Sequence, residues 1–427
     1  MNKFIKYLTI TLAIFGIFFI FISIKTIYLE KPKNDDLIIS ETKNRVGELD
    51  LIKTQEMEEV ELEIIEEKQD NEPGEKSSES PISIKNPINL EEQLVTHLLD
   101  IKSGSSSKGI AFSKDDKELW VTLLMNKSTG IRIFNPKTGE ELESINLNGN
   151  GGVEVIFSQD GTKAYVSQME TAKIFEIDTN TKEILRILNT NSAWTKVLKL
   201  SPDEKMIYAS NWVGNNVSEI DLITGILKQN ISTVKTPRGI YVTRDGKILY
   251  VAGFKDGEIQ KINLETEEKQ IIYQAGGAMR HIVADEEKNI LYISDMGQGK
   301  ILKVSLENDE IKEFAKTDTN PNTIALSPDN KILFVSNRGA NYSRDNYYLP
   351  GPEWGSVLLF DTETGKMLDA IIGGNQPTAL AISSDGKILA FSNFLDGEIE
   401  IYQIPPSEIL KTGNGGISKI YKGWIDK

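Results

Sequence analysis

The stretch Ser327-Pro328-Asp329-Asn330-Lys331-Ile332-Leu333-Phe334-Val335-Ser336-Asn337 combines a tight turn with a buried strand. Pro328 fixes the φ angle of a turn's first central position, and Asp329 and Asn330 tolerate the tight conformation by bonding to their own backbone. Ile332 to Val335 is a short apolar run with β-branched and aromatic members, which is typical of a strand buried on both faces. The stretch therefore predicts the end of one strand, a turn and a second strand.

The same stretch occurs seven times along the chain. One aligned column, named by its member in each copy, consists of Trp120, Tyr165, Tyr208, Tyr250, Tyr292, Phe334 and Ala390. The spacing between successive members is nearly constant, in the low forties, and lengthens only at the last step, from Phe334 to Ala390. Such a period, built from short strands, is typical of a β-propeller with one four-stranded blade per repeat. We therefore predict an all-β fold, a seven-bladed β-propeller.

The last repeat is one strand short. It supplies three strands and then reaches Pro405 and Pro406, which oppose a further ladder strand. Leu94 to Ile101 precedes the first complete repeat at the distance that a fourth strand takes elsewhere. We expect this N-terminal strand to close the ring and leave no free sheet edge.

Composition excludes several functional classes. The chain has 427 residues and no cysteine, which excludes disulfides, thiolate catalysis and cysteine-ligated metal. The net charge of −15 argues against a general nucleic-acid binder.

The N-terminus predicts a membrane segment. Leu8 to Ile24 is an uncharged run, and its length is close to the ~20 residues that a bilayer core requires. The alternative is a cleaved signal peptide, but no small-residue cleavage site lies between Phe21 and Glu30. We expect one uncleaved transmembrane anchor, with the propeller outside the cytoplasm, in the periplasm or at the cell surface.

Four segments follow from these patterns. Residues 1–28 form the anchor, and residues 29–89 form an acidic, largely disordered stalk. Residues 31–89 hold eight Lys or Arg against sixteen Asp or Glu, a net charge of −8. Residues 90–405 form the propeller, which we expect to be monomeric, and residues 406–427 form a loose C-terminal tail.

The repeats resemble the YVTN-type β-propeller family in Ile248-Leu249-Tyr250-Val251-Ala252, Leu291-Tyr292-Ile293-Ser294 and Ser327-Pro328-Asp329. That family includes exported and surface-layer propellers and is related to lactonase-type propellers. Further motifs resemble spirochaete surface-antigen propellers, namely Met279-Arg280-His281-Ile282, Asn337-Arg338-Gly339 and Gly373-Gly374-Asn375-Gln376-Pro377-Thr378. The resemblance covers about residues 92–404 and implies the fold, but one propeller fold hosts many activities.

One rim of the central channel is predicted to be basic. A fixed count back from each member of the aligned column gives the first residue of each innermost strand: Lys108, Val153, Lys196, Arg238, Arg280, Asn322 and Thr378. Converging cations in a partly desolvated funnel attract an anion, and two arginines can grip a carboxylate or phosphate bidentately. The alternative is that each base extends to water or pairs with Glu154 or with a neighbouring blade.

The same face carries the largest insertion, between the second and third strands of the sixth repeat. The chain is much longer from Phe334 to Gly355, the glycine before the third strand, than from Tyr250 to Gly257 in the fourth repeat. Aromatic residues and arginine on this face are typical of a recognition surface, or else the rings pack the loop down and cap the channel. The ligand-binding candidates are Lys108, Lys196, Arg238, Arg280, His281, Asn322, Trp212, Phe254, Arg338, Tyr342, Tyr347, Tyr348, Trp354 and Phe394.

Signals for catalysis are sparse. His281 is the one weak candidate for a general base, and His97, the other histidine, is interpreted as a spectator on the closing strand. No motif predicts a metal or a cofactor, and the recurring aspartates of the turns are interpreted as turn formers rather than calcium ligands.

Three hypotheses remain. The first is an anchored, exported propeller that binds a protein, a glycan or a small anionic ligand through its basic, aromatic face without catalysis. The second is a lactonase-like hydrolase that uses His281 at the channel mouth. The third is binding of a polyanion or single-stranded nucleic acid by cations beside stacking aromatics.

Overall fold

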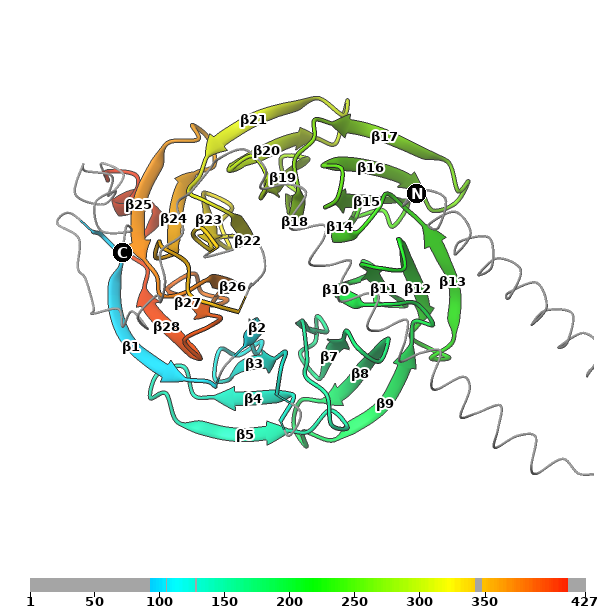
Figure 1. Ribbon diagram of the computed structural model, residues 1–427, viewed down its shortest axis with the longest axis horizontal. Coiled ribbons are helices and arrows are strands. Elements are labelled where there is room, and N and C mark those ends of the chain that lie inside the picture. The colour runs from blue at the N-terminus through cyan, green and yellow to red at the C-terminus, as the bar shows by residue number, and fades with distance from the viewer. Residues whose placement is uncertain (1–92, 105, 127–128, 342–347, 414–427) are drawn as a thin grey trace, which may run out of the picture. The chain divides into compact units, whose positions relative to one another are not determined.

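Seven four-stranded antiparallel sheets surround a central channel in the computed structural model, which describes residues 93–413 except 105, 127–128 and 342–347 (Figure 1). The innermost strands are β2 (Ser107–Phe112), β6 (Val155–Phe157), β10 (Thr195–Leu200), β14 (Pro237–Val242), β18 (Met279–Asp285), β22 (Pro321–Leu326) and β26 (Pro377–Ile382). The second strands are β3 (Leu119–Leu123), β7 (Lys163–Gln168), β11 (Met206–Asn211), β15 (Ile248–Gly253), β19 (Ile290–Asp295), β23 (Ile332–Asn337) and β27 (Ile388–Asn393).

The two outer positions of each blade complete the set. The third strands are β4 (Ile131–Phe134), β8 (Lys173–Asp178), β12 (Asn216–Asp221), β16 (Glu258–Asn263), β20 (Lys300–Ser305), β24 (Ser356–Asp361) and β28 (Glu398–Gln403). The outermost are β5 (Glu141–Ile145), β9 (Ile184–Asn189), β13 (Leu227–Ser232), β17 (Lys269–Gln274), β21 (Ile311–Lys316), β25 (Met367–Ile372) and β1 (Thr96–Lys102). The seven-bladed all-β fold predicted from the repeats is confirmed.

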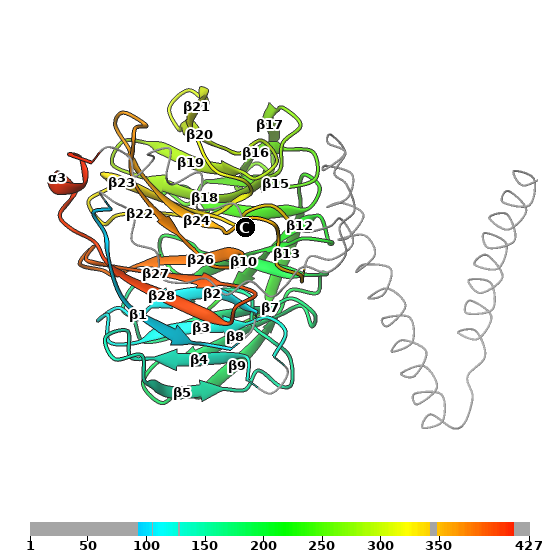
Figure 2. The same cartoon turned by 60° about the vertical axis from the view of Figure 1, so that its left-hand side comes forward.

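The N-terminal strand closes the ring. β1 pairs antiparallel with β28, so the seventh sheet has the order β1-β28-β27-β26 (Figure 2). The observed strand begins at Thr96, later than the expected Leu94, because Leu94 and Val95 instead donate their backbone N–H groups to Asp369 on β25. Ile101 of β1 is 2% exposed and packs with Leu119 and Val121 of the first blade. The closing strand therefore belongs both to the last sheet and to the contact with the first.

The turn chemistry agrees with the sequence. Ser327 Oγ donates to Asp329 Oδ1 at 2.6 Å, and the N–H of Lys331 donates to the same oxygen at 3.2 Å. Asn330 takes a positive φ of 56°, which asparagine tolerates. The same hydroxyl-to-aspartate pairing recurs at Ser113–Asp115, Ser158–Asp160, Ser201–Asp203, Thr243–Asp245 and Ser383–Asp385. These aspartates are turn formers, as predicted.

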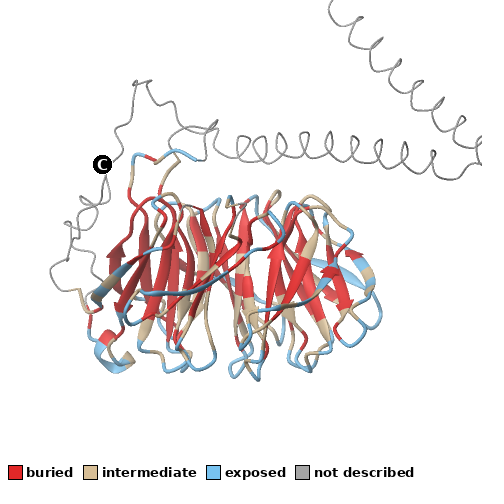
Figure 3. Cartoon of the chain, turned by 90° about the horizontal axis from the view of Figure 1, so that it is seen from below, coloured by how far each residue is buried: buried red, intermediate tan, exposed pale blue. Residues whose placement is uncertain are grey.

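The core lies between blades rather than within one sheet. Every residue of β23 is buried, as its two-faced apolar pattern predicts. The aligned aromatic Tyr292 of the fifth blade shares a cluster with Leu333 and Leu358 of the sixth. Figure 3 shows buried residues filling the inner strands, with exposed residues at the turns and outer strands. Each blade therefore depends on its neighbours for its hydrophobic contacts.

The expected segments outside the propeller are described only in part. The anchor and the stalk, residues 1–89, lie outside the described residues, and within the described ranges no helix is long and apolar enough to cross a bilayer. The tail differs from a loose coil where it is described. The helix α3 (Ser407–Leu410) buries Leu410 against the cluster shared by the last two blades. An apolar anchor residue therefore fixes the first turn of the tail.

Candidate functional site

The predicted rim residues surround one cavity. We call Lys108, Val153, Lys196, Arg238, Arg280, Asn322 and Thr378 the channel ring. The first six of them line a cavity of about 240 Å³ in the central channel. Lys196, Arg238 and Arg280 are 5%, 8% and 7% exposed, and Lys108 is partly buried. The structure thus brings all four predicted cations together.

Buried hydroxyl groups fix the backbone of the channel ring. Ser210 Oγ donates to the carbonyl of Arg238 in the next blade at 2.9 Å and accepts the N–H of Val197 in its own blade at 3.1 Å. Equivalent hydroxyls bond the ring carbonyls of Val153, Lys196, Asn322 and Thr378. The fourth blade has Ala252 at this position. We call these hydrogen bonds the hydroxyl latches. They link neighbouring blades at the channel ring, next to the cations.

Buried aromatic rings lie against the cations instead of forming an exposed surface. Lys196 Nζ lies 4.1 Å from the ring centroid of Trp212, Arg280 Cζ lies 5.8 Å from that of Phe254, and Lys108 Nζ lies 5.1 Å from that of Phe394. These three aromatic residues are 2%, 5% and 0% exposed. Because a cation over a ring face is attracted by the ring quadrupole, the rings stabilise the cluster of like charges. The sequence alternative in which the rings pack and cap the channel therefore describes them better.

The inserted loop contributes less than the sequence pattern indicated. Arg338 is 2% exposed and donates from Nη2 to Gln376 Oε1, so it is enclosed rather than presented. Trp354 is buried in the cluster between the fifth and sixth blades. Tyr348 is 53% exposed, and Tyr342 and Tyr347 lie outside the described residues. Of the described loop candidates, only Tyr348 offers an accessible side chain.

His281 lines the same cavity as the cations. Burial, followed by the positive charge of Arg238, lowers the pKa of His281 to about 4. The N–H of Ile324 donates to His281 Nδ1 over 3.4 Å, which places the proton of the neutral imidazole on Nε2. A neutral ring with Nδ1 occupied is a hydrogen-bond donor at Nε2 and a weak base.

Glu154 is the carboxylate among the lining residues. Its Oε2 accepts the N–H of Leu198 at 2.6 Å. Burial raises the pKa of Glu154 to about 7, against the opposing effects of that hydrogen bond and of Arg238 and Lys199. The lining therefore carries four cations against one acid that is half-protonated near neutrality. From the sequence, Glu154 was expected only as a possible ion-pair partner of a basic residue, because its place in the channel depends on a contact between blades.

Asn322 joins the cluster through Arg280. Arg280 Nε donates to Asn322 Oδ1, and Asn322 is 2% exposed. Arg280 Nη1 also lies 3.6 Å from the sulfur of Met296. These contacts hold the guanidinium group of Arg280 in place, and a fixed planar donor is suited to an anion with two oxygens.

Comparisons with known proteins agree with the repeats. A family model described as "Lactonase, 7-bladed beta-propeller" matches residues 260–409. The chain is 28% identical over 327 residues to antigen Lp49 of Leptospira interrogans serogroup Icterohaemorrhagiae serovar copenhageni (strain Fiocruz L1-130), covering 74% of this chain and 72% of the relative.

A solved structure agrees in fold. Kuenenia stuttgartiensis Hydrazine Synthase superimposes with a TM-score of 0.59 and 15% identity, covering 70% of this chain and 96% of that chain. At this identity the likeness shows the fold alone. Together the matches confirm the resemblance drawn from the repeats: this chain is a seven-bladed β-propeller that is similar to the lactonase-type propeller model and to a leptospiral antigen.

Proposed function

We propose that this propeller is a non-catalytic binding protein that holds a small, multiply charged anion at the channel ring. The convergence of Lys108, Lys196, Arg238 and Arg280 on one cavity carries the proposal. Cations in a partly desolvated concave site focus the electric field and raise the local concentration of anions. The low pKa of His281, to which Arg238 and Arg280 both contribute, supports a positive field inside the channel.

The cavity limits the size of the ligand. A volume of about 240 Å³ is below the roughly 300–1,000 Å³ of pockets for drug-sized ligands. Guanidinium groups recognise planar or tetrahedral oxyanions bidentately, whereas lysines act as point charges. We therefore expect a carboxylate, sulfate or phosphate group, either free or at the end of a glycan or protein side chain that enters the channel.

The test is calorimetric titration of the full chain with sulfate. Arg280→Gln should weaken binding about tenfold to a hundredfold, since a hydrogen bond to a charged group contributes roughly 1.5–3 kcal/mol. Arg244→Gln is the control, because Arg244 is an exposed arginine in a turn of the opposite face. Equal affinities of the two variants would refute the proposed site.

A lactonase-like hydrolase is the second candidate. The lactonase family model spans Arg280, His281 and Asn322, and this observation favours it. Two features count against His281 as a general base. Its Nδ1 already accepts the N–H of Ile324, and its pKa of about 4 is well below neutral pH, whereas efficient bases have a pKa near the working pH. Hydrolysis of a lactone panel that disappears in His281→Gln would establish the hydrolase over the binding role.

Binding of a polyanion or single-stranded nucleic acid has less support. Such sites expose aromatic faces on which bases stack. Trp212, Phe254 and Phe394 are at most 5% exposed, so their ring faces are covered.

We further propose that the propeller is displayed outside the cytoplasm on an N-terminal membrane anchor. The uncharged run from Leu8 to Ile24 and the similarity to a leptospiral antigen support this arrangement. Protease treatment of intact cells should remove the propeller while a cytoplasmic marker survives. Protection of the propeller until the cells are lysed would exclude external display.

A further inference from the structure

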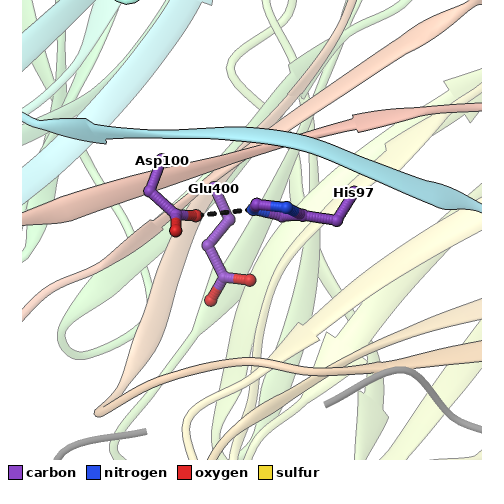
Figure 4. Close-up of side chains that lie close together, drawn as sticks. All are labelled: His97, Asp100 and Glu400. Carbon is purple, nitrogen blue, oxygen red and sulfur yellow. Dashed lines mark hydrogen bonds and ion pairs between the residues drawn. The ribbon is translucent and has the colours of Figure 1, made fainter. Parts of the chain in front are cut away.

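We propose a divalent-cation site of the zinc class on the seventh blade, formed by His97, Asp100 and Glu400. One ligand atom from each residue lies within 4.8 Å of the other two, and Figure 4 shows the three side chains close together on one side of the closing strand. His97 and Asp100 come from β1, at the start of the propeller sequence, and Glu400 comes from β28, at its end. The site lies on the outer strands, away from the channel.

A β-bulge brings the first two ligands together. Residues three apart in a regular strand point to opposite faces, because side chains alternate. The register between β1 and β28 shifts between His97 and Leu99, which leaves Leu98 as the extra residue. His97 and Asp100 therefore share the face that holds Tyr402 and Glu400, and His97 Nε2 lies 2.7 Å from Asp100 Oδ1. Bulges commonly re-aim side chains in this way.

The third ligand, Glu400, places a second carboxylate beside Asp100, and a cation between the two would relieve their repulsion. Asp100 lies directly opposite Glu400 in the ladder, and like charges at directly opposite positions destabilise a sheet. A divalent cation between the two carboxylates would convert this repulsion into attraction. Imidazole nitrogen with carboxylate oxygen is a ligand set that zinc and neighbouring first-row ions accept.

Neighbouring groups already orient Glu400. Asn393 Nδ2 donates to Oε1 at 2.7 Å, and the Tyr402 hydroxyl donates to Oε2 at 2.9 Å. Such bonds leave lone pairs on both oxygens and fix the direction of the carboxylate, as outer-shell contacts do in metal sites. His97 packs edge-on against Tyr402, with centroids 5.2 Å apart. Two of the three ligands are therefore held by contacts that do not involve a metal.

The ligand spacing suits one ion, and the site offers an entry path. Two ligands bonded to one ion at about 2.2 Å are at most about 4.4 Å apart. The three ligand atoms lie within 4.8 Å of one another, so any movement needed to bind one ion is small. The side chains of His97 and Asp100 are 29% and 36% exposed, which leaves a route from solvent, while Glu400 is 3% exposed. Bound metal would link the first strand of the propeller to its last blade and so stabilise the ring closure.

The test is titration of the full, untagged chain with Zn²⁺, followed by calorimetry and thermal melting. We expect one site per chain and a melting temperature that rises with Zn²⁺ concentration, because the ion binds only the folded chain. His97→Gln and Asp100→Asn should each weaken binding by more than about tenfold. The chain has only two histidines, so His281→Gln is a matched control that should retain full affinity.

A second measurement separates ligand loss from misfolding. Without metal, the His97→Gln and Asp100→Asn variants should melt no lower than the wild type, since both side chains are partly exposed. Co²⁺ should give a visible absorption band in the wild type and in His281→Gln that is missing in His97→Gln. The proposal is overturned if the wild type binds no Zn²⁺, or if binding is unchanged in both His97→Gln and Asp100→Asn.

Discussion

Glu154 and His281 occupy the same position in two different blades. Each follows its channel-ring residue by one position, and each accepts a hydrogen bond from the backbone of the next blade's innermost strand, at Leu198 and Ile324 respectively. Burial shifts both pKa values toward the neutral form, upward to about 7 for the acid and downward to about 4 for the imidazole. Two titratable groups therefore lie at the contacts between neighbouring blades, beside the cations.

Stability should depend on these two groups in opposite directions. The pKa of Glu154 is raised from 4.5, so the stability it contributes is complete below about pH 4.5 and is lost as the pH rises to about 7. Denaturant unfolding at pH 5 and pH 8 should show that Glu154→Gln becomes more stable relative to wild type at the higher pH. Parallel pH profiles for the two proteins would contradict the assignment.

His281 should act at the other end of the pH range. Its pKa is lowered from 6.5, so its contribution is complete above about pH 6.5 and is lost as the pH falls to about 4. His281→Gln should therefore lose less stability than wild type between pH 6.5 and pH 4, as measured by denaturant midpoints. A wild type and variant that lose stability equally would show that the imidazole titrates normally.

Anion binding should weaken as Glu154 ionises. The net charge of the cavity lining is more positive by one unit below the Glu154 pKa of about 7 than above it. We expect sulfate, whose charge is constant in this range, to bind more tightly to the wild type at pH 6 than at pH 8. Glu154→Gln should remove this dependence, and a dependence that persists in the variant would assign it to another group.

The hydroxyl latches between blades should contribute measurably to stability. Ser210→Ala leaves the carbonyl of Arg238 and the N–H of Val197 without this partner, which should cost about 1–3 kcal/mol of the free energy of unfolding. Ala252→Ser is the matched change, because it supplies the hydroxyl at the one blade that lacks it. Denaturant unfolding should find Ala252→Ser neutral or stabilising, and an equal loss in both variants would contradict the latch.

The closing strand should be essential for a soluble ring. Ile101→Ala removes a 2% exposed side chain from the contact between the last and first blades and should cost about 2–5 kcal/mol. Leu98→Ala, at the 45% exposed bulge position, should cost much less. Deletion of residues 90–103 should expose the edge of β28 and cause aggregation. A monomeric deletion product that melts cooperatively would refute the closure.

The fold and the channel ring could be predicted from the sequence because the repeated buried strands keep a constant register. Strands such as β23 are buried on both faces, so their repeats keep one register and a fixed count locates every innermost strand. That count is enough to identify Lys108, Lys196, Arg238 and Arg280 as neighbours around the channel. Side chains on loops lack such a constraint.

The remaining differences come from contacts that no local pattern encodes. The sequence left open whether the aromatic residues after the second strands form a recognition surface or pack inward, and the burial of Trp212 and Phe394 supports packing. His97 was interpreted as a spectator, and the proposed metal site depends on the bulge beside it and on the approach of Glu400 from the far end of the chain, which cannot be read from spacing.

The most direct test of the central claim is a crystal structure of the full chain soaked in selenate, with the anomalous selenium signal used to locate the anion. We expect an ordered selenate in the channel cavity within hydrogen-bonding distance of Arg238 and Arg280, and none there in Arg280→Gln. An empty channel at a selenate concentration that occupies other surface sites would contradict anion binding at the channel ring.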